Sequence, residues 1–330
     1  MYTCNIPLIN THTHAAMVGF RGLAEDLPLD KWLNDVIWPA EAKEVNKSFV
    51  YEQSKKAIKE MKNNKIKAFA DMYFFQEEVA KLAEQEKIHI LIWESIIDFP
   101  TPSSPSPELT LEKVEKMILE YKNSEYVKVS VAAHSIYTVS KENLLKAKKL
   151  ARKYDVIFQM HMAETKWEFD DSIRDHGVTP VQYADSLGLL DNKTILAHCV
   201  WLTDEDISIL ANRGVHVSHC PLSNMKLGSG IAPIQKMLDK WINISLWTDG
   251  SASSNRLDIW EAAKFTALVS KVHNLDPTCI PIRQLVKMMS INGMKALGLD
   301  SIDGQTIEDI EKTIEETDYS FLYHKNIDSL

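Results

Sequence analysis

Apolar runs of strand length alternate with amphipathic stretches of helical length along most of the chain. The runs expected to form strands lie at 6–10, 67–74, 88–97, 126–133, 156–163, 193–201, 215–220 and 242–248. Apolar residues at helical spacing occupy 48–63, 77–86, 111–121, 141–153, 204–212 and 231–240. This alternation indicates βαβ units and a parallel sheet. About eight such units close a (β/α)8 barrel of the TIM type, which is the α/β fold that the pattern favours.

Two segments interrupt the alternation. Residues 15–45 form a long insert with tryptophans after the first strand, and we expect it to be a lid over the active site. Residues 100–107 read PTPSSPSP and are expected to form a loop. The domain organisation that follows is one barrel at 1–299 and a charged, weakly patterned tail at 300–330. The competing fold is a doubly wound open sheet, but no GxGxxG motif follows the first strand.

Composition and charge narrow the class of partner. Of the 330 residues, 45% are hydrophobic and 25% charged, which is typical of a globular protein with a large core. The formal net charge of -9 argues against nucleic acid or an anionic membrane as a partner and is compatible with a small-molecule substrate. No apolar run reaches the roughly 18 residues of a membrane helix, and the first residues are too polar for a signal peptide.

Cysteine usage indicates the compartment. The chain has four cysteines, Cys4, Cys199, Cys220 and Cys279, which show neither CxxC spacing nor a small disulfide framework. A reducing, cytoplasmic setting is therefore expected. The sequence leaves the oligomeric state open, and a homo-oligomer is compatible with it.

Histidines and acids follow the predicted strands at the points where the strands end. Residues 10–14 read NTHTH, and two positions that lie two apart on an extended strand point to the same face, so His12 and His14 can bind one ion. Later strand ends supply the other candidates, His161 and Glu164 in VIFQMHMAE, His198 in TILAHC, His219 in VHVSHC and Asp249 in ISLWTDG. Because the C-terminal strand ends of a barrel form one ring, these residues are expected to converge.

Imidazole nitrogens together with a carboxylate are ligands that suit one divalent metal ion. Zinc is the expected ion, with Fe²⁺ or another divalent ion as the alternative. A site with three or four protein ligands leaves a position for water, whose pKa falls from about 15.7 towards about 7 on such an ion. Nearby carboxylates can then carry protons. The sequence therefore predicts a metal-dependent hydrolase.

The motifs NTHTH, HMAET, AHC, SHCPLSN and TDG occur in an order that resembles the amidohydrolase superfamily. The likeness is greater to the branch of S-adenosylhomocysteine and methylthioadenosine deaminases and related chlorohydrolases. It rests on LPLDKWLNDVIWPAE at 27–41, ADMYFF at 70–75, AHSIYTVS at 133–140 and SNMKLGSGIAPI at 223–234. The resemblance covers residues 8–299 and implies the hydrolytic deamination of an adenosine-type nucleoside, such as adenosine, 5′-deoxyadenosine or methylthioadenosine, with release of ammonia.

The resemblance also implies a role for each matching residue. The implied metal ligands are His12, His14, His161 and Asp249. Asp249 would in addition accept the proton of the attacking water, Glu164 would carry it to the ring nitrogen, and His198 would orient the nucleophile and stabilise the tetrahedral intermediate. His134 and His219 would contact the substrate ring, and Glu41 would bind the ribose hydroxyls.

The sequence departs from that branch in two places. Where an arginine is expected near the end of the third strand, IWESIID places Glu94, and residues 99–111 contain no Lys or Arg. A substrate carboxylate would then meet like charge, so neutral nucleosides are expected to be better substrates than S-adenosylhomocysteine. Lys113 could supply a charge nearby. The second departure is the family's small β-sandwich, which we expect to be largely absent, with at most one residual strand at 316–326.

Several further residues have two readings. Trp32 and Trp38 could stack on a base or pack inside the lid, and Asp71 could orient a metal ligand or make a structural hydrogen bond. Cys199 and Cys220 follow two of the histidines, but neighbouring strand residues face opposite sides, which favours core packing. Two other functions stay open: hydrolysis of another aminated or chlorinated ring (guanine, cytosine, pterin or triazine), and metal binding without turnover. An intact set of Glu164, His198 and Asp249 argues against the last.

Overall fold

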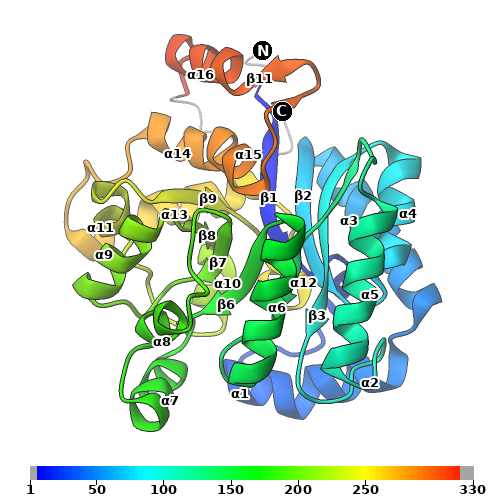
Figure 1. Ribbon diagram of the computed structural model, residues 1–330. Helices are drawn as coiled ribbons and strands as arrows, with labels where there is room; N and C mark the ends of the chain where they lie inside the picture. Colours follow the sequence, from blue (N-terminus) through cyan, green and yellow to red (C-terminus); the bar gives the residue numbers. More distant parts are fainter. Residues whose placement is uncertain (1–5, 320–330) are drawn as a thin grey trace.

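A computed structural model describes residues 6–319 and folds them around a parallel β-barrel with helices on its outside (Figure 1). The strands are β1 (Leu8–Thr13), β2 (Ile66–Tyr73), β3 (His89–Ile96), β4 (Val127–Val129), β5 (Val131–Ala133), β6 (Phe158–Met162), β7 (Thr194–His198), β8 (His216–His219) and β9 (Asn243–Leu246). Neighbours pair in parallel in the order β1-β2-β3-β5-β6-β7-β8-β9, and β4 also pairs with β3. The (β/α)8 barrel expected from the sequence is confirmed, and its predicted fourth strand is divided at Ser130 into β4 and β5.

Side chains complete the barrel between its first and last strands. Among the described residues, β1 and β9 share no ladder of backbone pairs. Instead, the buried Asn10 amide donates to Thr248 Oγ1 over 2.8 Å and its Oδ1 accepts from the Thr248 backbone N–H over 3.1 Å. Thr11 Oγ1 donates to the carbonyl of Leu246 over 3.2 Å. These bonds tie the NTHTH segment to the strand that precedes Asp249.

Helices follow the strands, and several of them begin at a residue whose side chain caps the helix. The helices are α3 (Lys47–Asn63), α4 (Gln76–Glu86), α5 (Pro107–Glu120), α6 (Lys141–Tyr154), α7 (Lys166–His176), α8 (Pro180–Ser186), α9 (Asp204–Arg213), α10 (Pro221–Lys226), α11 (Ile234–Asp239), α12 (Ser251–Ser254), α13 (Ile259–Asn274), α14 (Ile282–Met289) and α15 (Ile291–Leu297). Those with a side-chain cap are α3, α5, α7, α8, α9 and α13. Helix α5 begins before the predicted 111 because Ser106 caps it and Pro107 takes its first position. No helix within 6–319 is both long and apolar enough to span a membrane.

The insert after β1 is helical and lies at the end of the barrel where the strands finish (Figure 1). It consists of a 3-10 helix, η1 (Ala15–Phe20), then α1 (Leu29–Lys31), a π-helical turn, η2 (Trp32–Ile37), and α2 (Trp38–Glu44). Its apolar side chains Leu29, Trp32, Leu33 and Ile37 are buried. The insert can therefore cover whatever lies at the strand ends.

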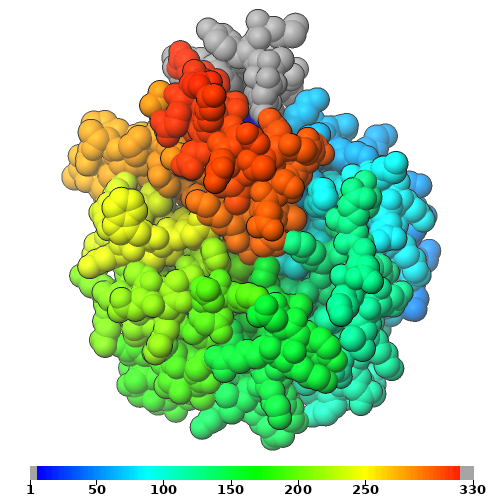
Figure 2. All heavy atoms as spheres, turned by 45° about the horizontal axis from the view of Figure 1, so that its top comes forward, coloured from blue at the N-terminus to red at the C-terminus, as the bar shows by residue number. Residues whose placement is uncertain are grey.

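The segment after residue 299 lies at the opposite end of the barrel, where the strands begin (Figures 1 and 2). It forms a small hairpin of β10 (Ser301–Ile302) and β11 (Gln305–Thr306), followed by α16 (Ile307–Glu316). Helix α16 buries Ile310 and Ile314 and packs on α14 and α15. Within the described residues these are the only strands outside the barrel sheet. Most of the strand expected at 316–326 lies outside the described residues.

Candidate active site

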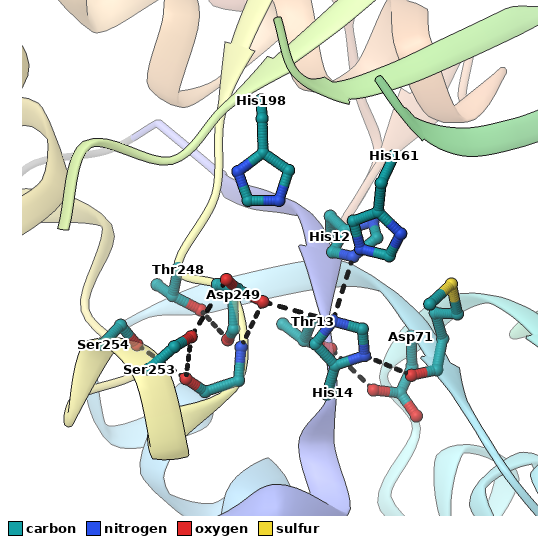
Figure 3. Close-up of polar contacts among 12 residues, drawn as sticks. His12, Thr13, His14, Asp71, His161, His198, Thr248, Asp249, Ser253 and Ser254 are labelled. Atoms are coloured by element: carbon teal, nitrogen blue, oxygen red, sulfur yellow. Dashed lines mark hydrogen bonds and ion pairs between the residues drawn. The ribbon is translucent and has the colours of Figure 1, made fainter. Parts of the chain in front are cut away.

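Three histidines from two distant strands meet at the C-terminal end of the barrel (Figure 3). His12 lies on β1, His14 follows it, and His161 lies on β6. One ring nitrogen of each falls within 4.8 Å of the others, and the Nε2 atoms of His12 and His14 are 3.3 Å apart. These three side chains form a group that could hold a metal ion, at the place where the sequence predicts one.

Backbone carbonyls orient two of the three rings. His14 Nδ1 lies 2.6 Å from the Met72 carbonyl oxygen, and His161 Nδ1 lies 2.8 Å from that of His134. Because a carbonyl only accepts, each Nδ1 carries a proton, so Nε2 is the ring nitrogen left to bind a metal. Burial, and then the neighbouring imidazoles, lower the pKa of His12 and His161 well below the usual value. Neutral rings with free lone pairs fit a divalent metal.

Asp249 lies beside the cluster, with Oδ1 3.2 Å from His14 Nε2. The loop after β9 holds its carboxylate: the Gly250 N–H donates to Oδ1 over 2.8 Å and the Ser253 hydroxyl donates to Oδ2 over 3.0 Å. Burial alone would raise the pKa of this acid, but the hydrogen bond and charge of His14 outweigh it and hold the pKa well below its ordinary value. Asp249 is therefore a carboxylate, as a metal ligand has to be.

Glu164 and His198 form a second pair in the same cavity. Glu164 Oε2 lies 3.3 Å from His198 Nε2, and His198 Nδ1 lies 2.8 Å from Asn224 Oδ1. Because the Asn224 side chain turns its amide oxygen towards the ring, it fixes the Nδ1–H form, and His198 Nε2 can accept a proton. Burial, followed by the charges of Asp249 and Glu168, raises the pKa of Glu164 well above the usual value. Burial therefore favours the protonated form of Glu164 over its charged form.

A cavity joins these groups to the lid. The polar residues on its wall are His14, Glu41, Tyr73, Ser95, His134, Tyr137, His161, Glu164, His198, Asp249 and Ser253. Its apolar wall comes largely from the lid and from β2 and β3, with Met17, Leu29, Trp32, Leu33, Ile37, Trp38, Phe74 and Ile97. Neither Lys nor Arg occurs among its described lining residues. The site is therefore an apolar pocket with acidic and imidazole groups on one side.

Of the three residues predicted to contact the substrate, two line the cavity and one does not. Glu41 and His134 both line the cavity. Burial raises the pKa of Glu41 to about 7 and lowers that of His134 to about 3. His219 is buried but lines a different, small hollow near Pro221 and Thr266. Its neighbour Ser218 turns its hydroxyl to Thr11 of β1, 2.9 Å away, so His219 faces the other side of the strand.

The structure also shows where the residues lie for which the sequence allowed two roles. Trp32 and Trp38 both line the cavity, and the Trp38 ring lies edge-on to Phe99 at 5.3 Å. Cys199 and Cys220 are fully buried and line no part of the cavity, and burial raises the pKa of both thiols. Asp71 Oδ1 accepts from the Thr13 hydroxyl and the Ala15 N–H, over 2.7 and 2.6 Å. It thus fixes the turn around His14 by structural hydrogen bonds.

Glu94 does not face the substrate cavity, and the like-charge argument built on it is wrong. Ser95 and Ile97 line the cavity, so Glu94 lies on the opposite face of β3. Its carboxylate accepts from the N–H groups of Phe75 and Gln76 at the start of α4, each over 3.0 Å, and from the Ser103 hydroxyl. Lys113 pairs with it at 3.1 Å. Glu94 is a buried helix cap, and Lys113 is engaged outside the cavity.

The sequence did not reveal the residues whose hydrogen bonds fix the reactive side chains in place. The Met72 carbonyl left no signal in the sequence, because any residue supplies one. Asn224 and Ser253 became visible only through their bonds to His198 and Asp249. Glu168 had a usable signal: 165–168 reads TKWE, the pattern of a helix capping box.

An α/β barrel with this cluster at its strand ends has the architecture of a metal-dependent hydrolase. Residues 7–304 match the sequence profile of the Amidohydrolase family, and the chain belongs to that family. It is similar to a 5-methylthioadenosine/S-adenosylhomocysteine deaminase of Thermodesulfovibrio yellowstonii, with 43% identity over 300 residues that cover 91% of this chain and 68% of the relative.

Two further relatives support the same assignment. A 5′-deoxyadenosine deaminase of Methanothermobacter thermautotrophicus is 42% identical over 296 residues, which cover 89% of this chain and 69% of the relative. Among solved structures, an adenosine deaminase from Xanthomonas campestris with bound zinc superimposes with a TM-score of 0.89 at 33% identity, over 92% of this chain and 69% of that one. The resemblance seen in the motifs is thereby confirmed.

Proposed function

We propose that this chain catalyses the hydrolytic deamination of an adenosine-type nucleoside and releases ammonia. The observation that carries the proposal is the meeting of Glu164, His198 and Asp249 with the three-histidine cluster in one lidded cavity. Similarity to nucleoside deaminases along about nine-tenths of the chain supports the substrate class.

The residues that would hold the metal are His12, His14, His161 and Asp249. Their fit rests on the converging Nε2 atoms and on the charged Asp249 carboxylate beside them. A bound divalent ion, for which we propose zinc, would supply a water acidic enough to act as a nucleophile at neutral pH. Fe²⁺ is the alternative that the same ligands accept.

The reaction adds water to the ring carbon that bears the exocyclic amine. Asp249 takes the proton of the water, and Glu164 delivers a proton to the adjacent ring nitrogen. His198 forms a hydrogen bond through Nε2 with the oxygen of the attacking water. Its Nδ1 is already bound to Asn224, and the ring lines the cavity. The amine then takes the proton held by Asp249 and leaves as ammonia, and the added hydroxyl returns a proton to Glu164 as the ring carbonyl forms. Glu164 suits its task because burial raises its pKa well above the ordinary value and so favours the form that can give up a proton.

The lid side of the cavity would hold the rest of the nucleoside. We assign Glu41 to the ribose hydroxyls and His134 to the ring, because both line the cavity. The walls formed by Trp32 and Trp38 suit an apolar face of the substrate. For His219 the cavity wall offers no support, and its proposed ring contact rests on the motif alone.

An ammonia-release assay over a panel of nucleosides and free bases tests the function. The protein is measured after chelation and after addition of Zn²⁺ or Fe²⁺, with His176→Ala as a matched control because His176 is exposed and stacks on Tyr183. Metal-dependent turnover of adenosine-type nucleosides is the expected result. Turnover of guanine, cytosine, a pterin or a chlorotriazine in preference to every nucleoside would overturn the proposal.

We also propose a reducing, cytoplasmic setting. Its support is chemical: Cys199, Cys220 and Cys279 are buried free thiols with no partner thiol among the described residues. Cys4 lies outside that range. Sedimentation of the purified protein would decide between a monomer and a homo-oligomer, and both remain compatible with the sequence.

A further inference from the structure

A buried carboxylate outside the cavity holds the backbone of the residue proposed to carry the proton. Glu168 is 1% exposed and does not line the cavity. Its Oε1 accepts from the Ala163 N–H over 2.9 Å, and its Oε2 accepts from the Glu164 N–H over 2.7 Å. Both oxygens of one carboxylate thus bind two successive backbone donors.

These bonds act on a tight turn. Ala163 has a φ of +50°, a left-handed conformation that a residue with a Cβ adopts at a cost. The turn separates His161, at the end of β6, from Glu164, whose side chain re-enters the cavity. The Ala163 carbonyl also accepts from the N–H groups of Val200 and Trp201, over 3.0 and 2.9 Å. Glu168 therefore fixes one side of a turn whose other side is tied to the segment after His198.

The sequence of this turn resembles a capping box, but its carboxylate acts differently. Thr165 caps α7 and accepts from the Glu168 N–H over 3.3 Å, which is the usual half of the motif. In the usual second half, the acid binds the N–H of the capping residue. Here the carboxylate, besides its interaction with the Thr165 backbone, reaches one and two residues further back and binds the N–H groups of Glu164 and Ala163. The bonds are directed at the active-site turn.

We propose that Glu168 is a positioning residue: its carboxylate sets the backbone from which the Glu164 side chain reaches His198 Nε2. The inference rests on the proposed function in that Glu164 is taken as the proton carrier. A misplacement of about 1 Å in such a group can cost about a hundredfold in rate. Glu168 thus governs turnover through Glu164 while touching neither substrate nor metal.

Asp206 offers a matched control within the same chain. It is buried, occupies the same third position of a helix, α9, and follows the neighbouring strand β7. Its carboxylate accepts from the N–H and hydroxyl of Thr203, both over 2.8 Å, and from the Thr179 hydroxyl. None of these partners lines the cavity. Asp206 therefore occupies the same helix position as Glu168 but holds no proposed catalytic residue.

The test compares Glu168→Gln with Asp206→Asn. Each change keeps the side-chain size but turns one oxygen into an NH2 group that cannot accept, so both variants are expected to lose thermal stability. Only Glu168→Gln is expected to lower kcat, by about 10- to 100-fold, with KM within about twofold and metal content unchanged. If Glu168→Gln does not fold, Glu168→Asp, which withdraws the carboxylate by one methylene, takes its place.

Two results would overturn the inference: an unchanged kcat in the Glu168 variant, or equal losses of kcat in both variants. Crystal structures of the pair give a readout that does not depend on activity. The inference expects the Glu164 carboxylate to leave His198 in the Glu168 variant alone, and an undisturbed pair there would refute it. An inactive wild-type protein would count against the proposed function, while the structures would still decide the role of Glu168.

Discussion

The described residues that line this cavity include no Lys or Arg to pair with a substrate carboxylate, which predicts a preference for neutral nucleosides. The perturbation is the group on the 5′ carbon: the methyl of methylthioadenosine against the zwitterionic amino acid of S-adenosylhomocysteine. The ionisable groups that line the cavity include the acids Glu41 and Glu164, and the apolar wall includes Ile37, Phe74 and Ile97. The sequence predicted the same preference from Glu94. Because Glu94 faces away from the cavity, the prediction now rests on the absence of Lys and Arg from the described lining residues.

The size of the effect follows from the missing partner. Leaving one charged group desolvated without a hydrogen bond or counter-ion costs about 3 kcal/mol, which corresponds to about a hundredfold in kcat/KM. The amino group of the homocysteine could pair with Glu41 and recover part of that cost. A neutral butylthio analogue of similar length separates charge from size, and we expect it to react within about tenfold of methylthioadenosine.

The assay is ammonia release at matched temperature and ionic strength, giving kcat/KM for methylthioadenosine, its butylthio analogue and S-adenosylhomocysteine. A companion variant, Ile97→Arg, places a cation on the apolar wall and should narrow the gap by raising activity on the charged substrate. Equal or better use of S-adenosylhomocysteine by the unmodified protein would refute the reasoning and require a cation that the cavity wall does not show.

Three further predictions concern the site and the barrel. Glu164→Gln should keep the fold and the metal but lower turnover by about 10²-fold, and near-normal turnover would exclude Glu164 as the proton carrier. His12→Ala and His161→Ala should each lower the bound metal measured by atomic emission to well below one equivalent, whereas His176→Ala should not, and full metal in the first two would place the ion elsewhere. Asn10→Ala should lower the free energy of unfolding in urea by about 2–4 kcal/mol, because it leaves the buried Thr248 N–H without an acceptor, and a loss within error would show that the barrel does not depend on this bond.

The ring of histidines could be predicted because it follows from topology alone. All barrel strands run in parallel, so residues at their C-terminal ends meet wherever they occur in the sequence. Which face of a strand a given side chain occupies could not be predicted in the same way. Strand β3 is apolar on both faces, so its pattern does not tell which of Glu94 and Ser95 points inward. The same uncertainty of one residue affected His219 beside Ser218.

Acids near strand ends posed the other problem, because the sequence does not tell a structural carboxylate from a reactive one. The structure separates them by whether the carboxyl group lines the cavity. Glu94 and Glu168 each bind two backbone N–H groups, one per oxygen, and such bonds hold turns and helix starts in place. Glu164 receives only a long 3.5 Å contact from Ser229 and otherwise faces His198. A carboxyl group that lines the cavity, such as Glu164 or Asp249, can exchange protons with a substrate, whereas Glu94 and Glu168 lie outside the cavity and position their neighbours.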